Sequence, residues 1–220
     1  MKRPPLIVLA VFAVAGLVAA GALWRLGDLR QQSATVTEES VPAPSTTDGF
    51  GGPFELTDQN GVRRRDAEFR GKYMLIFFGY TYCPDVCPTT LAVEAEALDQ
   101  IGERASRVVP IFITVDPRRD TPDKLKSYLS GFEPQPPSSR MGFVGLTGTA
   151  EEIEQVADAY EVFYQAHLDG RFGGGGQDYS VDHTGNVYLM SPEGKFVAYY
   201  SQGISPDELA ADLMMKVTPG

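Results

Sequence analysis

The 220-residue chain is poor in metal-binding and redox-active side chains, with only two cysteines and two histidines. It has no second cysteine pair, which disfavours a structural zinc site with four protein ligands. Basic residues are also few: 19 Lys and Arg against 29 Asp and Glu give a net charge of −10. No basic stripe is present to bind nucleic acid, and an acidic surface favours partners with a positive docking face.

The N-terminal region lacks ionisable side chains over a long apolar stretch, residues 6–24. About 20 such residues cross a bilayer, so we expect a single-pass transmembrane anchor. Lys2 and Arg3 precede it and place residues 1–5 in the cytoplasm. The rest of a bacterial chain would then lie in the periplasm, anchored to the inner membrane. The alternatives are a signal peptide cleaved near Ala20–Ala22 and, in a mitochondrion, a domain facing the intermembrane space.

Residues 25–52 are rich in small polar residues, which predicts a flexible tether, and residues 53–220 read as one domain. The overall composition, 43% hydrophobic and 22% charged, is typical of a globular protein. No internal repeat is visible. Continuous apolar runs predict buried strands at Tyr73–Tyr80 and Val108–Val115, and a third, shorter strand is expected at Gly142–Leu146.

Turn and capping residues predict the remaining elements of this domain. Asn60-Gly61 favours an N-terminal hairpin, and a second hairpin is expected from Asn186–Met190 and Phe196–Tyr200. Helices are expected at four places: Pro88–Glu103, and after the N-terminal signals Thr121–Asp123, Thr149–Glu152 and Ser205–Glu208. Strands that alternate with helices predict an α/β fold with a mostly parallel sheet, made mixed by the terminal hairpin and covered by helices on both faces. This is a thioredoxin-like layout with inserted loops.

The two cysteines, Cys83 and Cys87, lie between a predicted buried strand and the helix that follows it. Pro88 suits the first helical turn, so we expect Cys87 at the helix cap. Unpaired N–H groups there lower thiol pKa values and favour the thiolate, which binds metal or attacks a disulfide. A purely stabilising disulfide is the alternative, but a bond that closes so short a loop removes little chain entropy.

One histidine, His183, lies immediately before the predicted strand Asn186–Met190. In thioredoxin-like enzymes the corresponding loop faces the cysteine pair and usually carries a cis-proline. Two thiolates and an imidazole would form a soft site for copper(I), copper(II) or zinc, although zinc normally takes a fourth ligand. Asp182 is a candidate to orient His183 through a hydrogen bond. We expect His167 to be solvated, without a role, and Gly173–Gly176 to form a mobile loop.

Three ordered motifs resemble the Sco/SenC family: Gly79–Pro88 (GYTYCPDVCP), Thr114–Pro117 with Asp120–Pro122, and Val181–Thr184 (VDHT). The resemblance covers roughly residues 54–215 together with the N-terminal anchor. It implies a thioredoxin-like fold and a copper ion bound by the cysteines and histidine of these motifs. It also implies a role in assembling the CuA centre of cytochrome c oxidase subunit II. Further partners would be other copper chaperones or thiol reductases.

Two functions follow from this pattern. The first is a metallochaperone that binds copper through Cys83, Cys87 and His183 and is not a conventional enzyme. The second is a thiol–disulfide oxidoreductase or redox sensor in which Cys83 and Cys87 form a redox-active disulfide. The spacing is one residue longer than in C-x-x-C redox enzymes, and histidine replaces proline, so the sequence favours the first. A peroxidase is disfavoured, because no peroxidatic motif is evident.

Overall fold

The computed structural model describes residues 49–136, 138–167 and 179–218. The chain divides into two compact units, Met1–Val41 and Pro42–Gly220, and the first lies wholly outside the described residues. The expected anchor (6–24), most of the expected tether (25–52) and the glycine run Gly173–Gly176 are therefore also outside them. Within the described ranges, no helix has the length and apolar character needed to cross a bilayer.

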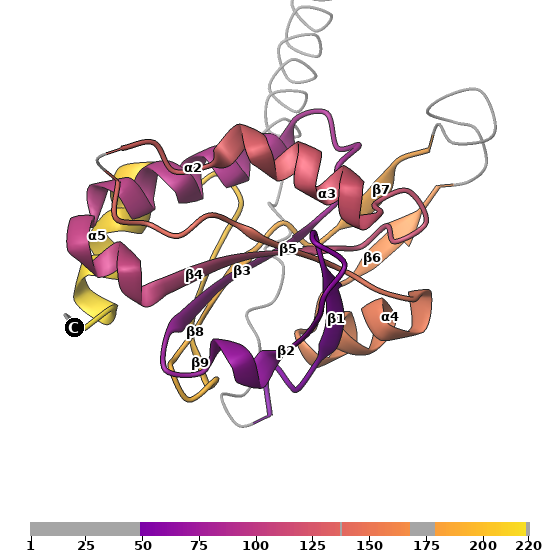
Figure 1. The fold of residues 1–220 in the computed structure, drawn as a ribbon, viewed down its shortest axis with the longest axis horizontal. Coiled ribbons are helices and arrows are strands. Elements are labelled where there is room, and N and C mark those ends of the chain that lie inside the picture. Colours follow the sequence, from indigo (N-terminus) through magenta and orange to yellow (C-terminus); the bar gives the residue numbers. More distant parts are fainter. Residues whose placement is uncertain (1–48, 137, 168–178, 219–220) are drawn as a thin grey trace, which may run out of the picture. The chain divides into compact units, whose positions relative to one another are not determined.

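A seven-stranded sheet in the order β2-β1-β5-β4-β3-β8-β9 forms the centre of the domain (Figure 1). Its strands are β1 (Glu55–Asp58), β2 (Arg63–Arg65), β3 (Tyr73–Gly79), β4 (Val108–Thr114), β5 (Val144–Thr147), β8 (Val187–Met190) and β9 (Phe196–Tyr200). Every residue of β3 and β4 is buried, as their continuous apolar runs predict. The thioredoxin-like α/β fold with a mixed central sheet is confirmed.

The sheet is more antiparallel than the alternation of strands and helices predicts. Within the described chain, only the β3–β4 and β4–β5 pairs are parallel. The other four neighbouring pairs are antiparallel, because both hairpins add to the parallel centre in the reverse direction: β1 joins β5, and β8 joins β3. The parallel centre is nevertheless the part that fixes where the loops after β3 and β4 lie.

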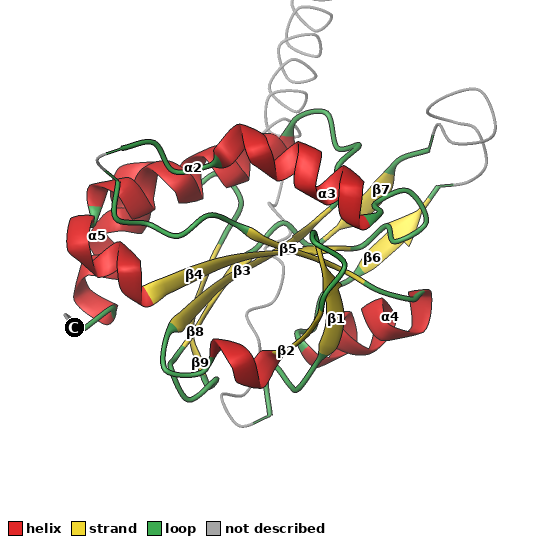
Figure 2. Cartoon of the chain, viewed as in Figure 1, coloured by secondary structure: helices red, strands yellow, loops and turns green. Residues whose placement is uncertain are grey.

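Helices cover both faces of the sheet (Figures 1 and 2). They are α2 (Val86–Gln100), α3 (Pro122–Leu129), α4 (Ala150–Ala159) and α5 (Pro206–Lys216), with short 3-10 helices at Asp66–Phe69, Gly102–Arg107 and Ser130–Phe132. In the figures α2, α3 and α5 lie on one face and α4 on the other. The three predicted caps are confirmed, since the side chains of Thr121, Thr149 and Ser205 each accept a backbone N–H from the first turn.

The helix after the cysteine loop begins earlier than predicted. Residue Asp85 is its N-cap and Val86 its first residue, so Cys87 lies inside the first turn and not at the cap. A proline is tolerated throughout the first turn, where backbone N–H groups have no helical partner, so Pro88 does not mark the helix start. The N-terminal side of the domain also differs: Phe50, within the expected tether, is buried, with its ring centroid 4.7 Å from that of Phe196.

A separate two-stranded sheet was not predicted. Strand β6 (Tyr164–Ala166) pairs antiparallel with β7 (Val181–His183), so that Tyr164 lies opposite His183. Both strands are short, and β6 is mostly exposed and lacks the alternation of apolar and polar residues that marks a strand. This small sheet is what carries the histidine toward the cysteines.

The glycine at the end of β3 generates a test of how closely α2 packs on the sheet. A Cβ atom at Gly79 would lie 2.9 Å from Cys87 Sγ and 2.9 Å from the ring of Phe112. We expect Gly79→Ala to lower the free energy of unfolding by about 1–3 kcal/mol, because the overpacked first turn must shift. Urea denaturation measures it. Gly131→Ala is the control, since nothing lies within 4 Å of its added Cβ; equal stabilities for the two variants would contradict the prediction.

Candidate metal centre

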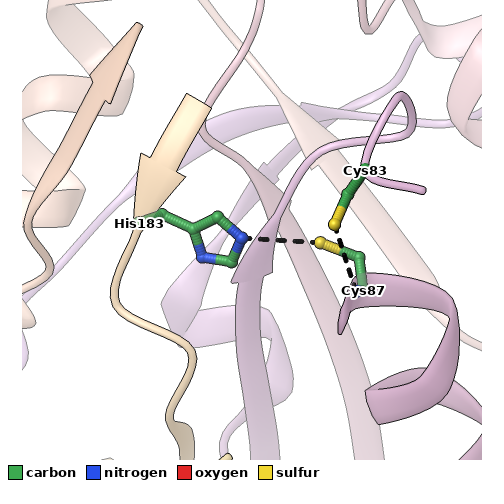
Figure 3. A group of neighbouring side chains, drawn as sticks. All are labelled: Cys83, Cys87 and His183. Carbon is green, nitrogen blue, oxygen red and sulfur yellow. Dashed lines mark hydrogen bonds between the residues drawn. The ribbon is translucent and has the colours of Figure 1, made fainter. Parts of the chain in front are cut away.

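The three residues singled out by the sequence lie together (Figure 3). Cys83 is in the loop after β3, Cys87 is in the first turn of α2, and His183 ends β7. Their sulfur and nitrogen ligand atoms all lie within 4.8 Å of one another. The Cys87 Sγ atom is 3.5 Å from His183 Nε2, and Cys87 N–H donates to Cys83 Sγ at 3.4 Å. Both cysteines are free thiols.

The site is closed on one side and open on the other. Cys87 is fully buried, whereas Cys83 and His183 are only partly buried. The imidazole is held edge-on by two aromatic rings, with centroids 6.0 Å away at Phe77 and 5.9 Å away at Tyr80. These two rings restrict the tilt of the imidazole, so its ring nitrogen is already oriented when an ion arrives.

The orientation of His183 is set by a backbone carbonyl. Its Nδ1 atom lies 3.0 Å from the Thr184 carbonyl oxygen, which leaves Nε2 directed at the sulfurs. Asp182, expected to orient His183, instead lies with its carboxylate 2.7 Å from His167 Nε2. Neighbouring residues on a strand point to opposite faces, so Asp182 faces away from the ring that it was expected to hold. His167, expected to be solvated and without a role, is thus the partner of Asp182.

The pKa values of the two cysteines are shifted in opposite directions. A hydrogen bond from the Cys87 thiol, with smaller contributions from His183 and the Cys87 N–H, lowers the pKa of Cys83 to about 3. The same hydrogen bond, together with burial and the nearby Cys83 charge, raises the pKa of Cys87 well above its usual value. At neutral pH the pair is therefore a Cys83 thiolate bonded to a neutral Cys87 thiol.

An arginine that sequence analysis did not single out ties the two halves of the site together. The guanidinium of Arg119 forms a buried ion pair with Asp116 and donates to the Tyr179 carbonyl at 2.9 Å. Its Cζ atom lies 3.5 Å from the ring centroid of Tyr179 and 4.6 Å from that of Tyr82. Tyr179 leads into β7 and Tyr82 precedes Cys83. Arg119 therefore connects the segment that carries the histidine with the loop that carries a thiol.

A second carboxylate fixes the cysteine loop to the end of β4. Asp120 is fully buried and accepts from Thr81 N–H at 2.9 Å, from Thr81 Oγ1 at 2.6 Å and from Thr114 Oγ1 at 2.6 Å. Burial raises the pKa of this carboxyl group, and the three hydrogen bonds oppose that rise. The sequence could have identified these two acids as part of the site. Asp116 and Asp120 follow a predicted buried strand, at the edge of the sheet where α/β proteins place functional groups.

The donor set fits a soft metal ion. Two sulfurs and one imidazole nitrogen are the ligands that copper and zinc take, and thiolates in particular select copper(I) or zinc. In the part of the chain that the structure describes, this is the one group of three or more His, Cys, Asp or Glu residues close enough to share an ion. Because Cys83 and His183 are partly exposed, an ion held by these three residues would be open to an exchanging ligand from that side.

A protein-family model described as SCO1/SenC matches residues 42–218. Among curated proteins, the human "Protein SCO1 homolog, mitochondrial" is 35% identical over 210 residues, which is 94% of this chain and 65% of that protein. The "SCO2-like protein" of Rickettsia felis is 35% identical over 211 residues, 95% of this chain and 97% of that protein. The chain thus spans just under two thirds of the human relative and nearly all of the bacterial one.

Solved structures similar to this chain include Sco proteins with copper bound. Bradyrhizobium japonicum ScoI with copper bound is 43% identical, with a TM-score of 0.66 over 77% of this chain and 99% of that one. Arabidopsis thaliana ScoI with copper bound is 38% identical, with a TM-score of 0.67 over 76% of this chain and 98% of that one. The fold and the sequence therefore point to the same set of relatives.

The lowered pKa of Cys83 predicts an unusual pH profile for alkylation of the reduced protein. Because the pKa is about 3, the thiolate fraction stays near one between pH 5 and pH 8, and the rate with iodoacetamide should stay nearly constant. An ordinary thiol slows about tenfold per pH unit in this range. Peptide mapping by mass spectrometry reports the labelled residue. In Cys87→Ala, which lacks the main cause of the shift, the rate at pH 5 should fall; a tenfold decline per unit in the parent would contradict the assignment.

Removal of Arg119 should be costly, because it leaves the Asp116 carboxylate buried without its cation. We expect Arg119→Met to lower the free energy of unfolding by about 3–5 kcal/mol, measured by urea denaturation. Arg118→Met removes a neighbouring exposed charge and should change it by less than about 0.5 kcal/mol. If the two variants are equally stable, Arg119 does not hold the site together.

Proposed function

Since the chain belongs to the SCO1/SenC family, we propose that it is a copper metallochaperone that binds copper through Cys83, Cys87 and His183. The observation that carries this proposal is the approach of their three ligand atoms to within 4.8 Å of one another. The copper ion bound in the ScoI structures from Bradyrhizobium japonicum and Arabidopsis thaliana supports the choice of metal.

Each donor has a distinct part in copper binding. The Cys83 thiolate is ready to bind without losing a proton, and its partial exposure gives the ion a point of entry. The buried Cys87 must release its proton when the metal binds, so binding is accompanied by proton loss to solvent. The imidazole of His183 adds a nitrogen donor, which suits copper(II), while the two sulfurs suit copper(I).

The cellular role that we propose follows from the family resemblance. Residues 6–24 anchor the chain in the inner membrane, and the part of residues 25–52 that precedes the buried Phe50 lets the domain reach its partners. The domain works in the periplasm. The copper is cargo for the CuA centre of cytochrome c oxidase subunit II. Other copper chaperones or thiol reductases supply the metal or the electrons. An acidic chain, with a net charge of −10, suits partners with positive docking faces.

A second function, thiol–disulfide exchange, is favoured by one observation: a stabilised thiolate at Cys83 lies beside a buried partner thiol. The Cys83 thiolate would attack a partner disulfide and release one partner thiolate. Deprotonated Cys87 would then displace the remaining partner sulfur, which leaves an oxidised Cys83–Cys87 pair and a reduced partner. This reaction does not require His183, whereas copper binding does, so a His183 variant distinguishes the two functions.

An anaerobic copper titration of the full chain tests the metallochaperone proposal. The parent should bind one copper ion tightly in each oxidation state. His183→Ala should weaken copper(II) binding at least tenfold, about 1.4 kcal/mol, because it removes the only nitrogen donor. Cys83→Ser should weaken copper(I) binding more strongly, because thiolate is the soft ligand.

The chain offers a matched control, since His167→Ala removes the only other histidine and leaves the three-residue group intact. Its copper(II) affinity should stay within about twofold of the parent's. If His183→Ala binds copper like the parent while the reduced protein rapidly reduces a model disulfide, the thiol–disulfide function replaces the metallochaperone.

A further inference from the structure

A cavity of about 320 Å³ lies beside the helix that follows the cysteine loop, and none of the three metal-centre residues lines it. It is bounded by the first half of α2, by residues 201–204 between β9 and α5, and by Leu209 of α5. Its volume is within the range of small-ligand sites. Asp85, between the two cysteines, and Gly185, two residues beyond His183, also form part of its wall. The cavity therefore shares its wall with the segments that carry the thiols and the imidazole.

The wall of this cavity contains a buried acid that the proposed function does not use. Glu94 is 0% exposed. Among the described residues, neither of its carboxylate oxygens has a hydrogen-bond partner. Burial raises the pKa of Glu94 well above its usual value, so on its own the group stays neutral. Buried carboxyl groups in proteins are normally hydrogen-bonded or paired with a cation. Glu94 is one of the residues that line the cavity, so a ligand bound there would lie next to this unpaired acid.

The residues that line the cavity restrict the kind of ligand that could pair with Glu94. Around Glu94 the wall is largely apolar, with Val86, Val93 and Val187 among its members. No basic side chain lines it among the described residues, and Asp85 adds a second acid. An anion would meet repulsion without compensation, whereas a cation on an apolar stem would satisfy both the carboxylate and the walls.

We propose that the cavity binds an ammonium or guanidinium group carried on a short apolar stem, with Glu94 as its counter-ion. On binding, Glu94 loses its proton to solvent and pairs with the cation. The group can belong to a free organic amine or to a Lys or Arg side chain of a bound protein. This site does not depend on copper binding, because Glu94 lies outside the three-residue metal group.

The test is an NMR titration of the full chain labelled with nitrogen-15, kept metal-free. The probes are n-butylammonium, the peptide acetyl-Gly-Lys-Gly-amide, and n-butanol as the neutral analogue of the amine. At least one cationic probe should shift the amide signals of Gly185, Gln202 and Gly203 saturably, and n-butanol should bind at least tenfold more weakly. Response to the free amine alone identifies a small-molecule site, and response to the peptide identifies a side-chain site.

Glu94→Gln keeps the size of the side chain and removes its charge, and should weaken cation binding at least tenfold. Glu96→Gln is the matched control, because it makes the same charge change at an exposed position of the same helix. Glu94→Leu provides a second uncharged variant should the glutamine not fold. The proposal is overturned if neither cation binds saturably, if n-butanol binds as tightly as the amine, or if the Glu94 and Glu96 variants behave alike.

Discussion

The parallel pairing of β3 with β4 is the constraint on which the rest of the domain depends. The two strands run in register from Tyr73 opposite Val108 to Gly79 opposite Thr114, and every residue in them is buried. Both strands consequently end at the same edge of the sheet, and the loops that follow them must meet there. One loop and the first turn of α2 supply the cysteines. The loop after β4 supplies Asp120 and Arg119, which hold the cysteine loop in place.

Packing at that edge places the donor atoms of the site before any metal arrives. Gly79 lacks a Cβ atom, so the first turn of α2 can bring Cys87 against the end of β3. The carboxylate of Asp120 takes three hydrogen bonds that tie Thr81 to Thr114, and Arg119 reaches from there to the segment before β7. A donor set built on such supports loses little entropy when it binds a ligand.

Much of this arrangement was predictable from the sequence, for identifiable reasons. The buried strands, the capped helices and both hairpins follow from local signals, because apolar runs and capping residues act over a few positions. The approach of His183 to the cysteines was predictable from its place before a strand in a thioredoxin-like layout and from the resemblance to the Sco/SenC family. The sequence pattern placed Cys87 at the helix cap, because Pro88 permits more than one start for the helix.

The remaining features depend on contacts between residues far apart in the chain. Strand β6 forms only because β7 pairs with it, and its own residues carry no strand signal. Asp182 pairs with His167, fifteen residues earlier in the chain, and not with the neighbouring His183. The role of Arg119 rests on three tyrosine rings, two from the cysteine loop and one from the segment before β7. None of these contacts has a short-range signature.

The two cysteines are buried to different depths, and this affects the order in which their bonds to an ion would break during transfer. Cys87 is sealed beneath the sheet edge, while Cys83 and His183 face the open side. An acceptor's ligand can approach a held ion only from that side, so it would displace the outer donors one at a time. Cys87 would be the last bond to break.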